Sequence, residues 1–67
     1  MQKFIDAARA NVDRHIGDIC TEDNDDADIQ ETVMTLAFDG AVDAGCNMVD
    51  AAFVASHVVE KFAAGVF

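Results

Sequence analysis

The residue types that could do chemistry in this chain are two cysteines, two histidines, a serine beside a histidine and a long run of acids. Thiolates and imidazoles are preferred zinc ligands, so Cys20 and His15 with Cys46 and His57 could form a metal site if the fold brought them together. A helix is expected between the two cysteines, and about 17 residues at ~1.5 Å each would separate them by roughly 25 Å. An intrachain disulfide is excluded as well, because its Cα atoms must lie within about 7 Å. We therefore expect no metal site and two free thiols near helix ends, with a cysteine that links two subunits as the alternative.

Catalytic chemistry has little support in the order of these residues. Ser56 and His57 are adjacent on an expected helix, so their side chains diverge and do not form a nucleophile and base pair. His57 and Glu60 could hydrogen-bond across three residues, but we expect them to form a narrow polar edge with Lys61. The chain also lacks a glycine-rich phosphate loop. The sequence therefore predicts no enzymatic activity and no cofactor.

Calcium binding is the next possibility, because Asp23, Asp25 and Asp28 are spaced like ligands in a loop. In an EF-hand loop counted from Asp23, Asp25 stands correctly at position three. Ala27 then occupies position five, Asp28 stands where the turn glycine belongs, and Met34 replaces the bidentate glutamate. The pattern thus does not predict a calcium site.

The acids themselves are distributed unevenly along the chain. Residues 1–19 are neutral, whereas from Cys20 onward ten acids face Lys61 alone, so the whole net charge of −9 lies there. Nucleic acid and anionic lipid are poor partners for such a surface, because binding phosphate requires positive charge. The expected partner is a basic protein, possible examples being DNA- or RNA-binding proteins, with no direct nucleic-acid contact and no membrane contact.

The elements that would position these residues are three helices. Apolar residues recur at steps of three and four from Ile5 to Ile19, which predicts an amphipathic helix over residues 2–19. Residues 20–27 form an acidic linker rich in turn-forming Asp and Asn. Asp28, followed by Glu31 three residues later, resembles an N-cap with an acid at N3 and predicts a second helix over 28–44.

The third helix is predicted over residues 48–65, after Gly45 at a left-handed C-cap and Asn47 at an N-cap. It is apolar on two faces, and such a helix needs two neighbours. One face contains Val49, Ala52, Phe53 and Ser56, and we expect it to pack on the other helices. The second face is expected to pack on another copy of the chain, and the predicted dimer interface consists of Met34, Phe38, Val54, Val58 and Phe62.

Size and composition agree with an all-α domain that spans residues 1–67 and is completed by homodimerisation. A chain of 67 residues buries only about 60% of the surface that it exposes when unfolded. A second copy would cover apolar faces that one copy cannot. No signal peptide is recognisable at the start, and His57, Glu60 and Lys61 interrupt the longest apolar region, so we expect a cytoplasmic location with reduced thiols.

The function that we expect is inhibition by binding. Carboxylates on rigid helices would meet the Lys and Arg side chains of a regulator or defence protein and thereby occupy its nucleic-acid-binding surface. Small acidic inhibitors made by phages act in this general way, which is an analogy of kind. The alternative is an adaptor homo-oligomer that binds a partner through an apolar helical surface, with the acids serving solubility alone. The predicted partner-binding residues are Glu22, Asp23, Asp25, Asp26, Asp28, Glu31, Asp39 and Asp43.

Overall fold

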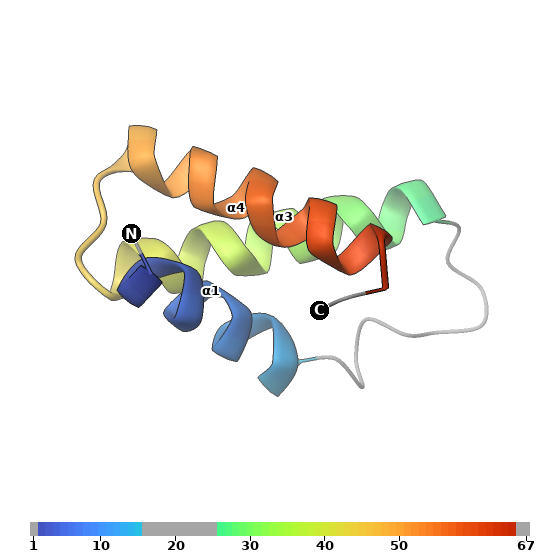
Figure 1. The fold of residues 1–67 in the computed structure, drawn as a ribbon, viewed down its shortest axis with the longest axis horizontal. Helices are drawn as coiled ribbons and strands as arrows, with labels where there is room; N and C mark the ends of the chain where they lie inside the picture. Colours follow the sequence, from blue (N-terminus) through green and yellow to red (C-terminus); the bar gives the residue numbers. More distant parts are fainter. Residues whose placement is uncertain (1, 16–25, 66–67) are drawn as a thin grey trace.

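Three α-helices make up the described part of this all-α chain. The computed structural model describes residues 2–15 and 26–65, in which helix α1 spans Gln2–Arg14, α3 spans Asp26–Asp43 and α4 spans Met48–Ala63 (Figure 1). No strand occurs within these two ranges. The predicted fold class and the predicted order of three helices are therefore confirmed.

Four helix boundaries differ from the predicted ones; α3 ends one residue early and α4 two residues early, and the other two differences are larger or change a cap. Helix α1 ends at Arg14, and the His15 N–H donates to the Val12 carbonyl oxygen at 3.0 Å. The remainder of the first predicted helix and most of the acidic linker lie outside the described residues. Helix α3 begins at Asp26, so Asp28 lies inside the helix and the prediction that it is the N-cap is wrong. Acids are favoured anywhere in the first turn of a helix by the helix dipole, which explains why the acidic run can continue the helix by two further residues.

The turn between α3 and α4 has the predicted caps. Gly45 has φ +102°, the left-handed conformation that favours glycine after a helix. The Gly45 N–H donates to the Val42 carbonyl oxygen and the Cys46 N–H to the Ala41 carbonyl oxygen, both at 3.0 Å, which is the Schellman arrangement. Asn47 then caps α4, because its side-chain oxygen accepts a 2.8 Å hydrogen bond from the Asp50 N–H.

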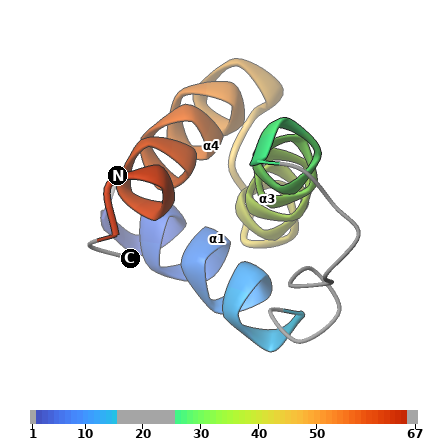
Figure 2. The same ribbon diagram turned by 90° about the vertical axis from the view of Figure 1, so that its right-hand side faces the viewer.

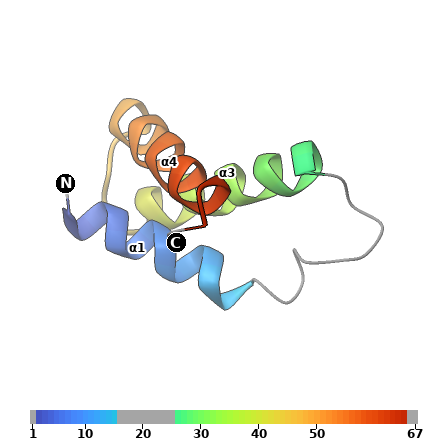
Figure 3. The same ribbon diagram turned by 45° about the vertical axis from the view of Figure 1, so that its right-hand side comes forward.

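The three helices run alternately up and down and pack side by side. Helix α3 returns antiparallel to α1, and the turn sends α4 back along α3 (Figure 1). Viewed from the end, the helices occupy the corners of a triangle, and each contacts the other two (Figure 2). The intermediate view shows that the start of α1 lies at the same end as the α3–α4 turn (Figure 3). The core therefore lies along the central axis that all three helices share.

Small side chains fill this core. The buried apolar residues of the described chain are alanines and valines together with Cys46, so none is larger than valine. Larger side chains, among them Leu36 and Phe38, are only partly buried around its edge. The buried residues are Ala8, Val12, Val33, Ala37, Ala41, Cys46, Ala51, Val54, Ala55 and Val58. Because small side chains allow close approach, the helices can lie near the lower end of the usual 8–10 Å interaxial range.

The closest approach is made at Gly40, where α3 meets α1. A Cβ atom at this position would lie 2.8 Å from the Cβ of Asn11 and 2.9 Å from the Ala7 carbonyl oxygen. Beside it, the Asn11 side-chain amide donates a 2.7 Å hydrogen bond to the Leu36 carbonyl oxygen. The missing side chain of Gly40 thus leaves room for a polar contact between the two helices.

Replacing Gly40 with alanine tests this contact. An alanine in an open helical position normally stabilises a protein by roughly 0.5–1 kcal/mol relative to glycine. We expect Gly40→Ala to lower the free energy of unfolding by about 1–3 kcal/mol instead, because the added Cβ must push α1 away. Urea denaturation followed by circular dichroism would measure the difference. Thr35→Ala on the exposed side of the same helix serves as the control and should change stability by less than about 0.5 kcal/mol. A stabilised Gly40→Ala protein would contradict the close packing.

Candidate partner-binding site

Helix α3 carries the acids that the structure describes on its outer side. The 18 residues of this helix include no Lys, Arg or His. Asp28, Glu31, Asp39 and Asp43 are all exposed, and at ~100° of rotation per residue they fall within the half of the helix that faces away from the core. We call these four residues the α3 acids. The acids of this helix therefore share one broad face.

The threonine hydroxyls between the α3 acids hydrogen-bond to the backbone of their own helix. The Thr32 hydroxyl donates to the Asp28 carbonyl oxygen at 2.9 Å, and the Thr35 hydroxyl donates to the Glu31 carbonyl oxygen at 3.1 Å. Both hydroxyls thus hydrogen-bond to backbone carbonyls four residues earlier, as Thr commonly does inside helices. The carboxylates therefore dominate the chemistry of this surface.

The end of α3 places two carboxylates against the helix dipole. Asp43 is the last residue of the helix and Asp39 lies one turn earlier, where the partial charge of the backbone carbonyls is negative. By contrast, Asp50 lies in the first turn of α4, where an acid is favourable. Its carboxylate also accepts a 3.0 Å hydrogen bond from the side-chain amide of Asn47. Asp50 therefore helps the fold, whereas Asp39 and Asp43 work against their own helix.

Part of the predicted partner-binding set lies outside the described residues. Glu22, Asp23 and Asp25 belong to that part of the chain, and of Asp26 only its place as the first residue of α3 is described. The structure therefore brings together the other four predicted residues, the α3 acids, and leaves the linker acids as a prediction.

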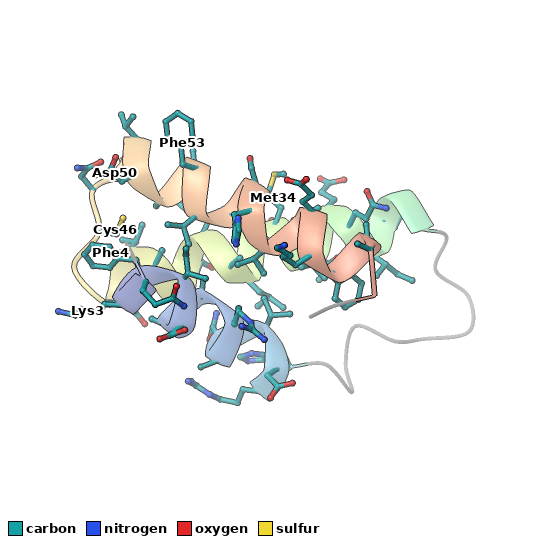
Figure 4. All side chains as sticks on the ribbon, viewed as in Figure 1. Lys3, Phe4, Met34, Cys46, Asp50 and Phe53 are labelled. Atoms are coloured by element: carbon teal, nitrogen blue, oxygen red, sulfur yellow. The ribbon has the colours of Figure 1, made fainter. Side chains whose placement is uncertain are left out.

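An exposed apolar surface lies at the beginning of α4. Met48, Val49 and Phe53 each expose about 70% of their surface, and Ala52 between them is also exposed. We call these four residues the α4 patch. Phe53 projects from α4 away from the bundle (Figure 4). Single exposed apolar residues are common, but four neighbours on two turns of one helix are typical of an interaction surface.

The α4 patch is shaped as well as apolar. Val49, Ala52, Phe53 and Ser56 line a shallow depression along the outer surface of the helix. A second depression lies on the other side of the Phe53 ring and is lined by Ile5, Val54 and His57 besides Phe53. The ring therefore stands as a ridge between two hollows, and a partner could contact it on both sides.

Two of the predicted dimer-interface residues are wrong. Val54 and Val58 are buried in the core of a single chain, so they cannot meet another copy. The core consists of small side chains, and the stripe of α4 that combines alanines with valines is the one that belongs to it. The stripe with Phe53, expected to face inward, faces outward instead.

The other predicted interface residues lie at the edge of the core. Met34 is 42% exposed, whereas Phe38 and Phe62 are partly buried against the core. Sequence reasoning missed Val49 and Phe53 as surface residues. The available signal was the spacing of Ala51 and Ala55, which marks the side of α4 that permits close packing.

The thiol of Cys46 is held inside the fold. Cys46 is buried beside the α3–α4 turn, and it is a free cysteine, as predicted. Burial raises the pKa of its thiol, and the nearby Asp50 carboxylate raises it further, while the amino terminus acts in the opposite direction. A thiol in these surroundings is a weak nucleophile, because only the thiolate reacts readily.

The described residues contain neither a cluster suited to a metal ion nor a helix suited to a bilayer. In residues 2–15 and 26–65, no group of three or more His, Cys, Asp or Glu side chains is placed to hold a metal ion. None of the described helices combines the length and apolar character needed to cross a bilayer.

Comparison with known proteins gives no further guide to the site. No family model matches this chain, and no curated protein and no solved structure is significantly similar to it. The α3 acids and the α4 patch are therefore the features from which a function can be inferred.

The reactivity of Cys46 provides a test of the turn that buries it. In a Cys20→Ser background, we expect iodoacetamide at mildly alkaline pH to alkylate Cys46 at least about tenfold more slowly in the folded protein than in urea. Because folding raises the pKa of the Cys46 thiol, the protonated thiol contributes to the free energy of unfolding below the pKa of the unfolded state. This contribution is lost as the pH rises through the higher pKa of the folded state. Mass spectrometry of timed samples would measure the rates. Equal rates in folded and unfolded protein would show that the thiol is accessible.

Proposed function

We propose that this chain is a non-catalytic protein-binding module that occupies a basic surface of a partner protein. The α4 patch is the observation that carries this proposal. A small protein that leaves Met48, Val49 and Phe53 in water, while the described residues of its core include nothing larger than valine, loses hydrophobic stabilisation of its own fold. An exposed aromatic side chain flanked by hollows is typical of the anchors that dominate binding energy in interfaces.

The charge of the chain supports a basic protein as the partner. The net charge of −9 and the α3 acids favour a protein whose surface is rich in Lys and Arg. Asp39 and Asp43 are informative because they oppose the dipole of their own helix and so have no role in stabilising it. In this proposal the acids attract and orient the partner, and the α4 patch supplies contact area once water is excluded.

The biochemical consequence is competition with phosphate. Surfaces rich in Lys and Arg commonly bind nucleic acid, and a bound acidic module would neutralise the same side chains. The chain would thereby inhibit a DNA- or RNA-binding regulator or defence protein in the cytoplasm. No covalent step and no cofactor is required, because the bound module blocks the surface directly.

The second candidate is a homodimeric adaptor that uses the α4 patch as its subunit interface. The exposure of Val49 and Phe53 supports this candidate as well. The subunit interface would then be the α4 patch and not the predicted residues Val54 and Val58, which are buried in the core. In this case the acids keep the dimer soluble. The two candidates differ in their response to salt, because apolar association persists where charge attraction is screened.

Neutralising the acids at the end of α3 tests the first candidate. We expect the double variant Asp39→Asn, Asp43→Asn to retain about one tenth or less of the partner captured from host lysate at about 0.1 M salt. The isolated variant should unfold at a higher temperature, because each removed carboxylate relieves roughly 0.3–1 kcal/mol of repulsion by the helix dipole. A variant that is more stable but binds its partner more weakly would indicate that these two residues serve binding and not folding.

The matched control removes the same amount of charge from another helix. Asp6→Asn with Asp13→Asn in α1 lowers the net negative charge equally and should keep capture within about twofold of the unaltered chain. Equal loss in both double variants would mean that only overall charge matters, and the α3 acids would not be a binding site.

Sedimentation and salt distinguish the second candidate. A homodimer built on the α4 patch should be present at micromolar concentration, persist at about 1 M salt, where the Debye length is near 3 Å, and dissociate in Phe53→Ser. The first candidate predicts a monomer throughout and loss of the partner complex at high salt. If the dimer resists salt and Phe53→Ser abolishes it, the inhibitor proposal is rejected in favour of the homodimeric adaptor.

A further inference from the structure

The apolar surface of α4 points directly away from the rest of the described chain. The helix buries the stripe formed by Ala51, Val54, Ala55 and Val58. At ~100° per residue, the opposite stripe contains Val49, Phe53, Ser56 and Glu60. None of the described helices can cover this stripe, because α1 and α3 both pack on the buried side. Its first two turns are apolar and its later turns are polar.

The shape of the surface along this stripe suits an elongated ligand such as a helix. The depression between Val49 and Phe53 has the small side chains of Ala52 and Ser56 in its lining. Small residues four apart let a facing helix approach at the close end of the 8–10 Å range. The Phe53 ring rises beside them and can insert between side chains of the facing helix. The depression follows the axis of α4, so a helix laid along it would contact all four residues.

The charges around the patch determine the composition of that helix. Asp50 lies three residues before Phe53 and neighbours the α4 patch, whereas Glu60 lies farther along the same stripe, one turn beyond Ser56. Lys61 is the only Lys or Arg of α4. A helix with an apolar stripe flanked by Lys and Arg would bury its apolar side chains on the α4 patch and place cations near both carboxylates. A second copy of this chain would instead bring a further net charge of −9.

We propose that the α4 patch is the docking site for a basic amphipathic helix of the partner protein. This inference rests on the proposed function and names the structural element of the partner that the module recognises. The helix would lie along α4, with apolar residues at helical spacing against Val49, Ala52 and Phe53. Recognition of this kind is helix-in-groove binding, read by anchors three and four residues apart.

Three synthetic peptides of about 18 residues, long enough for roughly five helical turns, test the proposal with the full chain. The first has leucines at helical spacing and lysines elsewhere; the second replaces the leucines by serines; the third replaces the lysines by glutamates. Backbone amide NMR shifts at about 0.1 M salt map the contact. The Lys/Leu peptide should bind saturably and shift the amides of residues 48–56, whereas the other two should bind at least about tenfold more weakly.

Point variants locate the contact. Phe53→Ser should weaken the Lys/Leu peptide at least about tenfold, whereas Met34→Ser, which removes an exposed apolar side chain from α3, should change it less than about twofold. Circular dichroism of both variants at the working temperature confirms that they remain folded.

Each other outcome has a defined meaning. Equal binding of the Lys/Leu and Lys/Ser peptides would overturn the helix site but leave the proposed function standing on charge alone. Equal binding of the Glu/Leu peptide would overturn both the helix site and the basic partner. A dimer that Phe53→Ser dissociates would identify a second copy as the occupant. Binding of none of the peptides would overturn the helix inference, while the variants at Asp39 and Asp43 would still test the proposed function separately.

Discussion

The close approach of the helices is the constraint on which this fold depends. Gly40 brings the backbone of α3 against α1 so tightly that a methyl group would meet Asn11 and the Ala7 carbonyl. Along the axis beside this contact, the buried apolar residues are alanines, valines and Cys46. The composition of the core therefore agrees with how near the helices lie, and not only with how apolar their residues are.

Larger apolar side chains lie around this core of small ones. The larger residues Leu36 and Phe38 lie at the edge of the core, and Phe53 lies on the surface. Burying the Phe53 ring in a wider core would have added to the stability of the fold. Here that ring is exposed, so a core of small side chains and an apolar surface on α4 occur in the same protein.

The sequence predicted the helices better than it predicted their orientation. Gly45 and Asn47 act through local backbone geometry, which depends on nearby residues alone, so the turn between α3 and α4 was correctly anticipated. Which side of α4 faces inward depends on the sizes of residues on the other two helices. Both sides contain valines, and hydrophobicity favoured the one with the aromatic ring, so Val54 and Val58 were assigned to the wrong surface. The shared face of the α3 acids followed from helical periodicity, and their poor fit to the helix dipole required knowing where α3 ends.

The hydrogen bond from Asn11 to the Leu36 carbonyl has a further consequence for how α1 is positioned along α3. Contacts among alanines and valines are nearly interchangeable, so they do little to fix the axial position of one helix against the other. A directional bond of 2.7 Å to one carbonyl, made beside the glycine that admits the close approach, is satisfied at a single axial position. The polar pair and the glycine together thus specify the register of an interface in which the apolar contacts provide the adhesion.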